Sequence, residues 1–600
     1  MIDPVDSPAL PIAEIFRQGL THHQAGRLPD ADACYRQVLT HAPTHAPILH
    51  LLGQVALQSG RNDAAVEYLT EAIGHEPSSA EYHSNLGNAL AGLGRLPEAE
   101  TCYREALRLQ PAVPVTLNNL GNALRDQSRA AEAETYYRAA LGLDATYVEA
   151  HNNLGNVLQD LDRLEEAQDC LSTAIGLKPD FTQAHLDLGR LLRKLGRLED
   201  AAASFRTALG LMPDLLEARH TLGNVMRELG RLEDAASCYR EVLRVDPTMA
   251  RAHYNLAMML HELGRPEEAE ISFREALRLE PDMAVAHGSL AGALLLTGQF
   301  DEGWREYEWR WRGGFESFNW DRGFSQPQWV GEALGDRVLL LHAEQGFGDS
   351  LQFCRYAPLA AARGRVILEV PRPLVRLMTS LPGVEQVIAI GDPLPNFDLH
   401  CPLMSLPGAF GTTLDTIPGR TPYLAAASSQ IEAWRRRVEV LPGLRVGIFW
   451  AGNPRLSAAG PNSVDRRRSI ALSRFAPLAD VAGVRFVSLQ KGEAASQARP
   501  DGMVLHDWTD ELDDFADTAA LIETLDLVIG VDSAVLHLVG ALGKPVWLLN
   551  RFDSCWRWLQ HRTDSPWYPT LRQFRQPRPG DWDSVMTDLH AALENLASAP

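Results

Sequence analysis

The sequence predicts an all-α repeat region followed by an α/β region, and three observations support this division. Small residues recur every 34 positions through the first half of the 600-residue chain. All 13 tryptophans lie at or after Trp304. From Val338 onward, short apolar runs alternate with helical stretches and glycine-rich turns. Two kinds of protein are therefore joined near residue 312.

The repeat is defined by ladders of residues that share one period. One ladder of small residues is Gly19, Gly53, Gly87, Gly121, Gly155, Gly189, Gly223, Ala257 and Ala291. A second is Ala31, Ala65, Ala99, Ala133, Ala167, Ala201, Ala235, Ala269 and Gly303. Small residues at two fixed positions let paired helices approach closely. A glycine at the turn between them ends the first helix, with Ser128 and Asp162 as exceptions, and a proline stops the second.

This pattern resembles the tetratricopeptide repeat, as in the phrase from Gly94 to Ala99, Gly-Arg-Leu-Pro-Glu-Ala. We expect about nine units over residues 11–316, after a disordered segment at 1–10, with the ninth unit as an atypical cap. Such repeats form a superhelix whose concave face binds extended or helical peptides. The repeat region therefore predicts a protein partner.

Two rows of asparagine on the first helix of each repeat are candidates for binding that partner. One row is Asn85, Asn119, Asn153 and Asn255, and the other is Asn88, Asn122, Asn156 and Asn224. An amide both donates and accepts, so it can bind a peptide backbone of any sequence. The repeat half of the eukaryotic O-linked N-acetylglucosamine transferase is similar and uses such a row. The alternative is that these are consensus helix-surface residues, and the rows are interrupted at Asp187, Arg190 and Thr221.

The second half predicts two Rossmann-like units. The first runs from the apolar residues 338–341 through the turn at Gln345–Ser350 to strands at 366–370 and 387–390. The second begins at 445–450, and its turn at Val531–Ala534 opens a helix. We expect a linker at 317–335, an acceptor-side lobe at 336–430, and a nucleotide-sugar donor lobe at 431–600 with a closing C-terminal helix. Two such lobes facing a cleft form the GT-B fold.

Specific motifs resemble glycosyltransferase family 9, the heptosyltransferase type. They are Gly348-Asp349 in the first turn, the Asp-Ser-Ala-Val-Leu-His run from Asp532 to His537, and residues 541–545. The junction at Trp304–Trp311 and the stretch Asp564–Pro569 resemble bacterial proteins that carry this domain after tetratricopeptide repeats. Some such proteins in alphaproteobacteria glycosylate flagellin. The resemblance implies transfer of a sugar from a nucleotide-sugar co-substrate, with no cofactor.

The resemblance makes Asp349 the counterpart of the base that activates the acceptor hydroxyl; alternatively, this residue caps the following helix. Asp532, Ser533, Ala534, Val535 and His537 are expected to form the phosphate loop, because the backbone N–H groups at a helix start can bind phosphate.

Basic residues outside these two turns are further candidates for binding the donor. Arg466, Arg467 and Arg468 could clamp a pyrophosphate or a sugar carboxylate, with Lys491 as a weaker candidate. The alternative for the arginines is a set of solvated loop charges.

We expect the chemistry to be independent of metal. Asp581 and Asp583 match the spacing of a metal-binding Asp-x-Asp, but they precede the closing helix, so Asp581 is more simply interpreted as its cap. The chain has no paired cysteines or His-x-x-His spacing.

Composition and charge narrow the function further. The net charge of −21 argues against nonspecific binding to nucleic-acid phosphates. No run of 18 apolar residues occurs, and the N-terminus lacks the basic and apolar segments of a signal peptide. Cys34, Cys102, Cys170 and Cys238 lie 68 residues apart, as expected for small packing residues of alternate repeats, and the odd total of seven cysteines suits a reducing compartment. These features favour a cytoplasmic protein with no membrane span.

Three functions are compatible with these sequence features. The first is a protein O-glycosyltransferase that holds its acceptor, plausibly flagellin, with the repeats. The second is a non-catalytic scaffold with a degenerate transferase domain. The third is an envelope-polysaccharide transferase whose repeats assemble partners. An intact Asp349 and an intact Asp532–His537 loop count against degeneration.

Overall fold

The computed structural model describes residues 12–312, 322–452, 465 and 467–598. The predicted N-terminal segment 1–10 and the candidate Arg466 lie outside this set. The chain falls into two compact units, one ending at Val245 and one beginning at Asp246. The second unit contains both the last helices of the repeat region and the two β-sheets.

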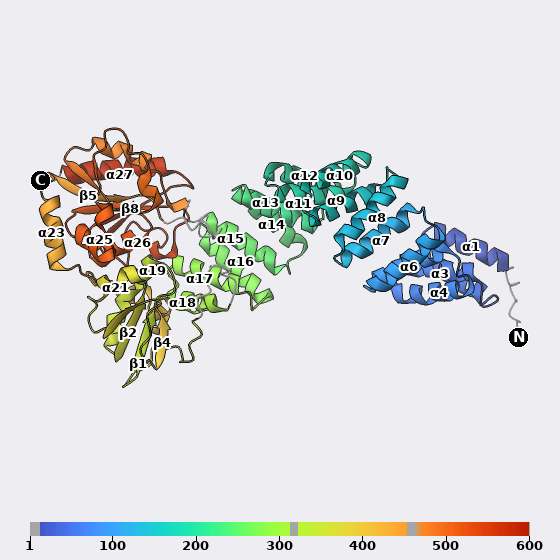
Figure 1. Cartoon of the computed structure of the whole chain (residues 1–600), viewed down its shortest axis with the longest axis horizontal. Helices are drawn as coiled ribbons and strands as arrows, with labels where there is room; N and C mark the ends of the chain where they lie inside the picture. The colour runs from blue at the N-terminus through green and yellow to red at the C-terminus, as the bar shows by residue number, and fades with distance from the viewer. Residues whose placement is uncertain (1–11, 313–321, 453–464, 466, 599–600) are drawn as a thin grey trace, which may run out of the picture. The chain divides into compact units, whose positions relative to one another are not determined.

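The first unit consists of paired antiparallel helices, as the 34-residue period predicts (Figure 1). Its helices are α1 Ile12–Gln24, α2 Leu28–Leu39, α3 Ala46–Gln58, α4 Asn62–His75, α5 Ala80–Gly92, α6 Leu96–Leu109, α7 Pro114–Asp126, α8 Ala130–Leu143, α9 Val148–Asp160, α10 Leu164–Leu177, α11 Thr182–Lys194, α12 Leu198–Leu211, α13 Leu216–Glu228 and α14 Leu232–Val245. The second unit continues the series with α15 Ala250–Glu262, α16 Pro266–Leu279, α17 Ala284–Leu296 and α18 Phe300–Tyr307, followed by the 3-10 helix η1 Glu308–Trp311.

The repeat ladders have the structural roles that the sequence predicts. A Cβ on Gly87 would lie 2.6 Å from the ring of Tyr103, so the small residue makes room for the aromatic side chain of the paired helix. The turn glycines have φ between 70° and 86°, as at Gly26 and Gly298. Ser128 and Asp162 adopt the same left-handed conformation, with φ of 62° and 59°, although they carry side chains.

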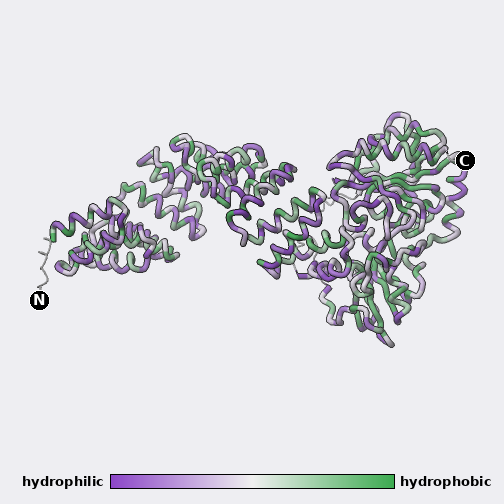
Figure 2. The backbone as a smooth tube through the Cα atoms, turned by 180° about the vertical axis from the view of Figure 1, so that it is seen from behind, coloured by the Kyte–Doolittle hydropathy of each residue, from purple (hydrophilic) through white to green (hydrophobic). Residues whose placement is uncertain are grey.

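The second half of the chain contains two parallel sheets. The four-stranded sheet has the order β3-β2-β1-β4, and the six-stranded sheet has the order β10-β9-β8-β5-β6-β7. The strands are β1 Val338–His342, β2 Arg365–Val370, β3 Gln386–Ala389, β4 Leu399–Pro402, β5 Leu444–Phe449, β6 Val484–Ser488, β7 Leu505–His506, β8 Leu527–Val531, β9 Val546–Asn550 and β10 Leu571–Arg575. Figure 2 shows these strands as largely hydrophobic, as expected for sheets buried on both faces.

The helices that accompany the sheets agree with the sequence in place and differ in detail. They are α19 Phe347–Phe353, α20 Ala357–Ala361, α21 Arg372–Met378, α22 Leu406–Ala409, α23 Ser428–Val438, α25 Phe515–Ile522, α26 Ala534–Ala541 and α27 Trp582–Ala597, with the 3-10 helices η5 Leu472–Asp480 and η8 Trp556–Trp558. Strand β4 has no clear sequence signal, because His400 and Pro402 interrupt its apolar run. A proline is tolerated there because β4 is an edge strand.

The last repeat helices share the hydrophobic core of the sheets. Phe300 and Trp304 belong to the same buried cluster as the strands of both sheets. The indole Nε1 of Trp304 donates to the carbonyl of Thr412 at 3.1 Å, and its ring lies 5.3 Å from the ring of Trp556. The predicted change near residue 312 is therefore a change of secondary structure inside one packed unit.

Candidate functional site

The strand orders mark two places where ligands bind in open parallel sheets. The order reverses between β1 and β4 in one sheet and between β5 and β8 in the other. Crevices form at the carboxyl ends of strands that flank such a reversal. The loop carrying Asp349 follows β1, and the loop carrying Asp532 follows β8. The two acidic candidates thus occupy equivalent positions in the two sheets.

Asp349 is fixed by hydrogen bonds from both sides. It is the third residue of α19, and its Oδ2 accepts from the backbone N–H of Gly346, the residue that caps the helix, at 2.9 Å. Its Oδ1 pairs with Nη2 of Arg557. The capping alternative is therefore realised, although Asp349 lies within the helix rather than at its cap position.

The second loop places a histidine next to an aspartate. Ser533 has extended backbone and precedes α26. His537, one turn into the helix, is 4% exposed. Its Nδ1 forms a 2.9 Å hydrogen bond with the hydroxyl of Tyr568, and its Nε2 lies 3.8 Å from Oδ1 of Asp532.

Burial sets the protonation state of this histidine. Desolvation lowers the pKa of His537 to about 4, with the charges of Arg557 and Arg355 acting in the same direction and Asp532 opposing them. Burial raises the pKa of Asp532, but nearby His537 and Arg468 outweigh this and the net pKa is lowered. At neutral pH the pair is therefore a neutral imidazole beside a carboxylate.

The two loops touch one another across the sheets. A Cβ on Gly348 would lie 2.9 Å from Cδ2 of His537 and 3.5 Å from Cα of Ala534. The glycine before Asp349 is therefore required for close approach to the start of α26, and helices α19 and α26 pack together. Asp349, Asp532 and His537, which are far apart in the sequence, form one cluster.

The predicted basic candidates separate in the structure. Arg468 pairs with Asp465 at 2.9 Å and contributes to the field at Asp532. Arg467 instead bridges Glu262 of the repeat helix α15, at 3.2 Å, and Asp553, at 3.0 Å. Lys491 donates its ammonium to the carbonyl of Leu512. Of these three, Arg468 is the residue whose charge helps to lower the pKa of Asp532.

The asparagine rows are largely engaged within the repeats. The Oδ1 atoms of Asn88, Asn122 and Asn224 accept from the hydroxyl groups of Tyr103, Tyr137 and Tyr239 at 2.7–2.8 Å. In the other row, the amide Nδ2 atoms of three members contact a neighbouring repeat: Asn85 reaches His50, Asn119 reaches Asn88, and Asn153 reaches Asn118.

The row that contains Asn88, Asn122 and Asn224 changes partner at Asn156, where the tyrosine is missing. Position 171, which would supply a hydroxyl to Asn156, is a leucine, and the Nδ2 of Asn156 instead donates to Asp187 at 2.8 Å. Asn255 lies on α15 in the second unit. Tyrosine therefore orients Asn88, Asn122 and Asn224 through their oxygens, which directs their N–H donors away from the tyrosine.

The C-terminal Asp-x-Asp is not assembled as a metal site. Oδ1 of Asp581 accepts from the backbone N–H of Ser584 at 3.1 Å, which makes it the cap of α27. Asp583 pairs with Arg474 at 2.5 Å. Within the described part of the chain, no group of three or more His, Cys, Asp or Glu side chains is arranged to hold a metal ion.

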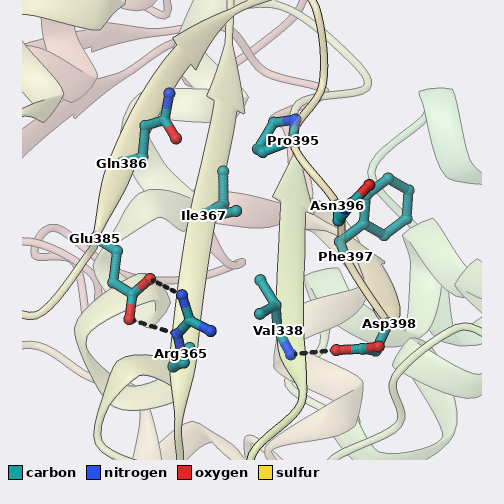
Figure 3. A pocket seen from close by; sticks show the side chains of 9 residues that line it. All are labelled: Val338, Arg365, Ile367, Glu385, Gln386, Pro395, Asn396, Phe397 and Asp398. Carbon is teal, nitrogen blue, oxygen red and sulfur yellow. Dashed lines mark hydrogen bonds and ion pairs between the residues drawn. The ribbon is translucent and has the colours of Figure 1, made fainter.

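A cavity of about 380 Å³ lies at the opposite edge of the four-stranded sheet (Figure 3). Val338 and Arg365, the first residues of β1 and β2, line it. Arg365 pairs with Glu385, and the backbone N–H of Val338 donates to Asp398. This cavity contains none of the predicted site residues, and ligands of parallel sheets bind at the carboxyl edge. It is therefore separate from the candidate site.

Sequence reasoning missed Arg557 and the aromatic residues around it. Arg557 belongs to a second Trp-Arg-Trp tripeptide, and the first copy, Trp309–Trp311, lies within the junction stretch Trp304–Trp311. Tyr568 lies in the quoted stretch Asp564–Pro569 but received no role there. The repeated tripeptide was the available signal, because aromatic residues that flank an arginine commonly bury its side chain.

Comparisons with known proteins agree with the repeat assignment. Residues 13–220 match the model of the cilia and flagella-associated protein 70 C-terminal domain, and residues 220–284 match a tetratricopeptide repeat model. The chain contains tetratricopeptide repeats. In the part that the structure describes, no helix is long and apolar enough to cross a membrane.

The relatives cover parts of the chain. Protein FlbA of Caulobacter vibrioides is 28% identical over 335 residues, which represent 51% of this chain and 54% of that protein. The chain thus spans about half the length of the curated relative it matches. YrrB, described as a TPR protein with an unusual peptide-binding site, is 26% identical; 31% of this chain and 95% of YrrB are covered, with a TM-score of 0.28. The Cut9–Hcn1 hetero-tetramer structure is 17% identical over 47% of this chain and 55% of the matched chain, with a TM-score of 0.36.

Proposed function

We propose that the protein is a protein O-glycosyltransferase of GT-B type, which transfers a sugar from a nucleotide sugar to Ser or Thr of a protein held by the repeats. The observation that carries this proposal is the meeting of Asp349 with Asp532 and His537. Each loop lies at the carboxyl end of its own parallel sheet, beside the reversal of strand order.

The cluster has the groups that glycosyl transfer needs. A carboxylate such as Asp349 can accept the proton of the acceptor hydroxyl. The N–H groups at the start of α26 and nearby cations can stabilise the departing diphosphate. A neutral His537 can donate one hydrogen bond and accept another, because it stays uncharged down to about pH 4.

The repeats supply the protein substrate in this proposal. Asn88, Asn122 and Asn224 are oriented by tyrosines and offer N–H donors that fit backbone carbonyls. Flagellin is the proposed acceptor, because the motifs resemble those of bacterial flagellin glycosyltransferases. The sugar nucleotide is the proposed co-substrate, without a metal.

Intact-mass analysis of flagellin tests the reaction. Flagellin purified from cells with the wild-type protein should carry added sugar mass, and cells with Asp349→Asn should yield unmodified flagellin at equal protein level. Asp336→Asn, at an exposed turn before β1, is the matched control and should retain the modification. If flagellin has the same mass with wild-type, Asp349→Asn and deleted protein, flagellin is not the acceptor.

A non-catalytic scaffold is the second candidate, and one observation favours it. Both carboxylate oxygens of Asp349 are already bound, by Gly346 and Arg557. A scaffold would retain flagellin binding in pull-down with the full-length protein while modifying no acceptor. The third possibility, an envelope-polysaccharide transferase, predicts that polysaccharide rather than flagellin changes in the Asp349→Asn strain.

A further inference from the structure

Arg557 is a buried cation held between groups from both sheets. Its side chain is 11% exposed. Its guanidinium carbon lies 4.3 Å from the ring centroid of Trp556, and Nε donates to Oε1 of Gln352 at 2.8 Å. Nη2 pairs with Oδ1 of Asp349. A buried guanidinium in this position depends strongly on its carboxylate partner.

The remaining donors of Arg557 face weak acceptors. Nη1 donates to Sγ of Cys555 at 3.1 Å, and Nη2 also lies 3.9 Å from Sδ of Met404. Sulfur accepts hydrogen bonds weakly, and a guanidinium has five N–H donors in a planar fork. Much of the donor fork of Arg557 is therefore available to a stronger acceptor.

Arg310 differs from Arg557 because its donors are bound to strong oxygen acceptors. It is 7% exposed and donates to both oxygens of Glu344, at 3.1 and 3.2 Å. It also donates to Glu308 at 2.8 Å and to the hydroxyl of Ser405 at 2.6 Å. Strong oxygen acceptors surround Arg310, whereas the acceptors of Arg557 in the described part of the chain are one carboxylate oxygen, one amide oxygen and two sulfur atoms.

The position of Arg557 suits a phosphate ligand. Arg557 pairs with Asp349, the neighbouring Gly348 lies against His537, and His537 Nε2 is 3.8 Å from Asp532, so the groups share one site next to α26. A diphosphate carries more negative charge than a single carboxylate, and its oxygens match the guanidinium fork. It therefore competes with Asp349 for Arg557.

We propose that Arg557 exchanges partners when the donor binds. Without a ligand, Arg557 is neutralised by Asp349; when a diphosphate enters, the guanidinium binds phosphate oxygens and Oδ1 of Asp349 is released. The exchange involves hydrogen bonds and ion pairs only. It rests on the proposed function, because it explains how a masked carboxylate becomes free to act as the base only after the nucleotide sugar is in place.

Calorimetric titration of the full-length protein with inorganic pyrophosphate tests the exchange. Asp349→Asn removes the competing anion, so this variant should bind pyrophosphate about tenfold more tightly than wild-type. Arg557→Gln, with or without Asp349→Asn, should lose the binding. The proposal is overturned if Asp349→Asn binds no more tightly than wild-type, if Arg557→Gln binds as wild-type does, or if neither wild-type nor Asp349→Asn binds at all.

Two controls keep the result interpretable. Arg310→Gln should leave pyrophosphate affinity unchanged, because Arg310 is bound to Glu344 outside the exchange. Pyrophosphate should raise the melting temperature of Asp349→Asn more than that of wild-type, which shows that the variant is folded and that the anion occupies the emptied position. Equal melting shifts in the two proteins also overturn the exchange.

These measurements need neither sugar nor acceptor, so they separate the exchange from the proposed function. Unmodified flagellin together with the expected pyrophosphate pattern would reject flagellin as the acceptor and leave Arg557 as an anion-binding residue. Modified flagellin with unchanged affinity in Asp349→Asn would reject the exchange alone.

Discussion

The tripeptide Trp-Arg-Trp occurs twice, at Trp309–Trp311 and at Trp556–Trp558, and each arginine is buried and pairs with a carboxylate in the segment that follows β1. In each copy a tryptophan also packs against a histidine. Trp309 stacks on His287 with ring centroids 3.7 Å apart, and Trp558 lies 5.3 Å from His537. The two segments thus attach a repeat helix and the six-stranded sheet to the same loop.

The difference between the two copies lies in how completely the arginine is bound. Among the residues that the structure describes, Arg310 pairs with two carboxylates and a hydroxyl, whereas Arg557 pairs with one carboxylate, that of Asp349. Burying a cation is costly unless its donors are satisfied. The first copy therefore serves the permanent junction of repeats and sheet, and the second can respond to a ligand.

Loss of Asp349 should have the largest effect on stability. Asp349→Ala leaves Arg557 buried without its carboxylate, and we expect the free energy of unfolding to fall by about 3–5 kcal/mol. Urea unfolding of the full-length protein without added anions measures this. If Asp349→Ala lowers the free energy of unfolding no more than Glu344→Gln does, the two copies do not differ as proposed.

The histidine beside the second copy should make stability depend on pH. The pKa of His537 falls from about 6.5 when unfolded to about 4 when folded, so its contribution is complete above pH 6.5 and is lost as pH falls towards 4. The shift corresponds to about 3 kcal/mol. In urea unfolding, wild-type should therefore lose more stability than His537→Gln between these pH values. An equal loss of stability in the two proteins would contradict the lowered pKa of His537.

At the first copy, Glu344→Gln should lower the free energy of unfolding by about 2 kcal/mol, because it weakens charge-assisted hydrogen bonds to Arg310. Glu308 still compensates the charge of Arg310 in this variant. Thermal unfolding measures the change. Added pyrophosphate should restore none of the lost stability, in contrast to Asp349→Asn. An equal rescue at both sites would show that the two arginines do not differ.

The smallest effect is expected at an exposed pair. Arg365 and Glu385 form two hydrogen bonds, at 2.9 and 3.1 Å, yet both side chains are more than 40% exposed. Surface ion pairs contribute little, because water and salt screen them. Glu385→Gln should leave the melting temperature unchanged. A clear drop in melting temperature would show that ion pairing, rather than burial of the charged groups, determines how much stability is lost.

The repeats were predictable because each helix pair is specified locally. Gly87 must be small where Tyr103 packs, and such requirements recur at every 34th residue. The turn conformation is also local, and it holds even at Ser128 and Asp162. In contrast, η5 is a 3-10 helix, in which Pro477 removes a backbone donor.

The candidate site was only partly predictable. Asp349 and Asp532 were found because each follows an apolar strand and a recognisable turn. Arg557 was missed, since it lies more than 200 residues from Asp349 and no local pattern joins them. The asparagine rows were found correctly as rows, but their hydrogen bonds to Tyr103 and Tyr137 depend on the folded helix pair.

The sequence by itself determined the period of the repeats, the parallel strands of the second half and the two acidic turns, because backbone propensity and hydrophobic pattern act over short distances. Only the tertiary structure decided that Gly348 meets His537 and that Arg557 reaches Asp349. These contacts join separate sheets, and their energies come from burial and charge compensation across the chain. Such compensation leaves no periodic trace in the sequence.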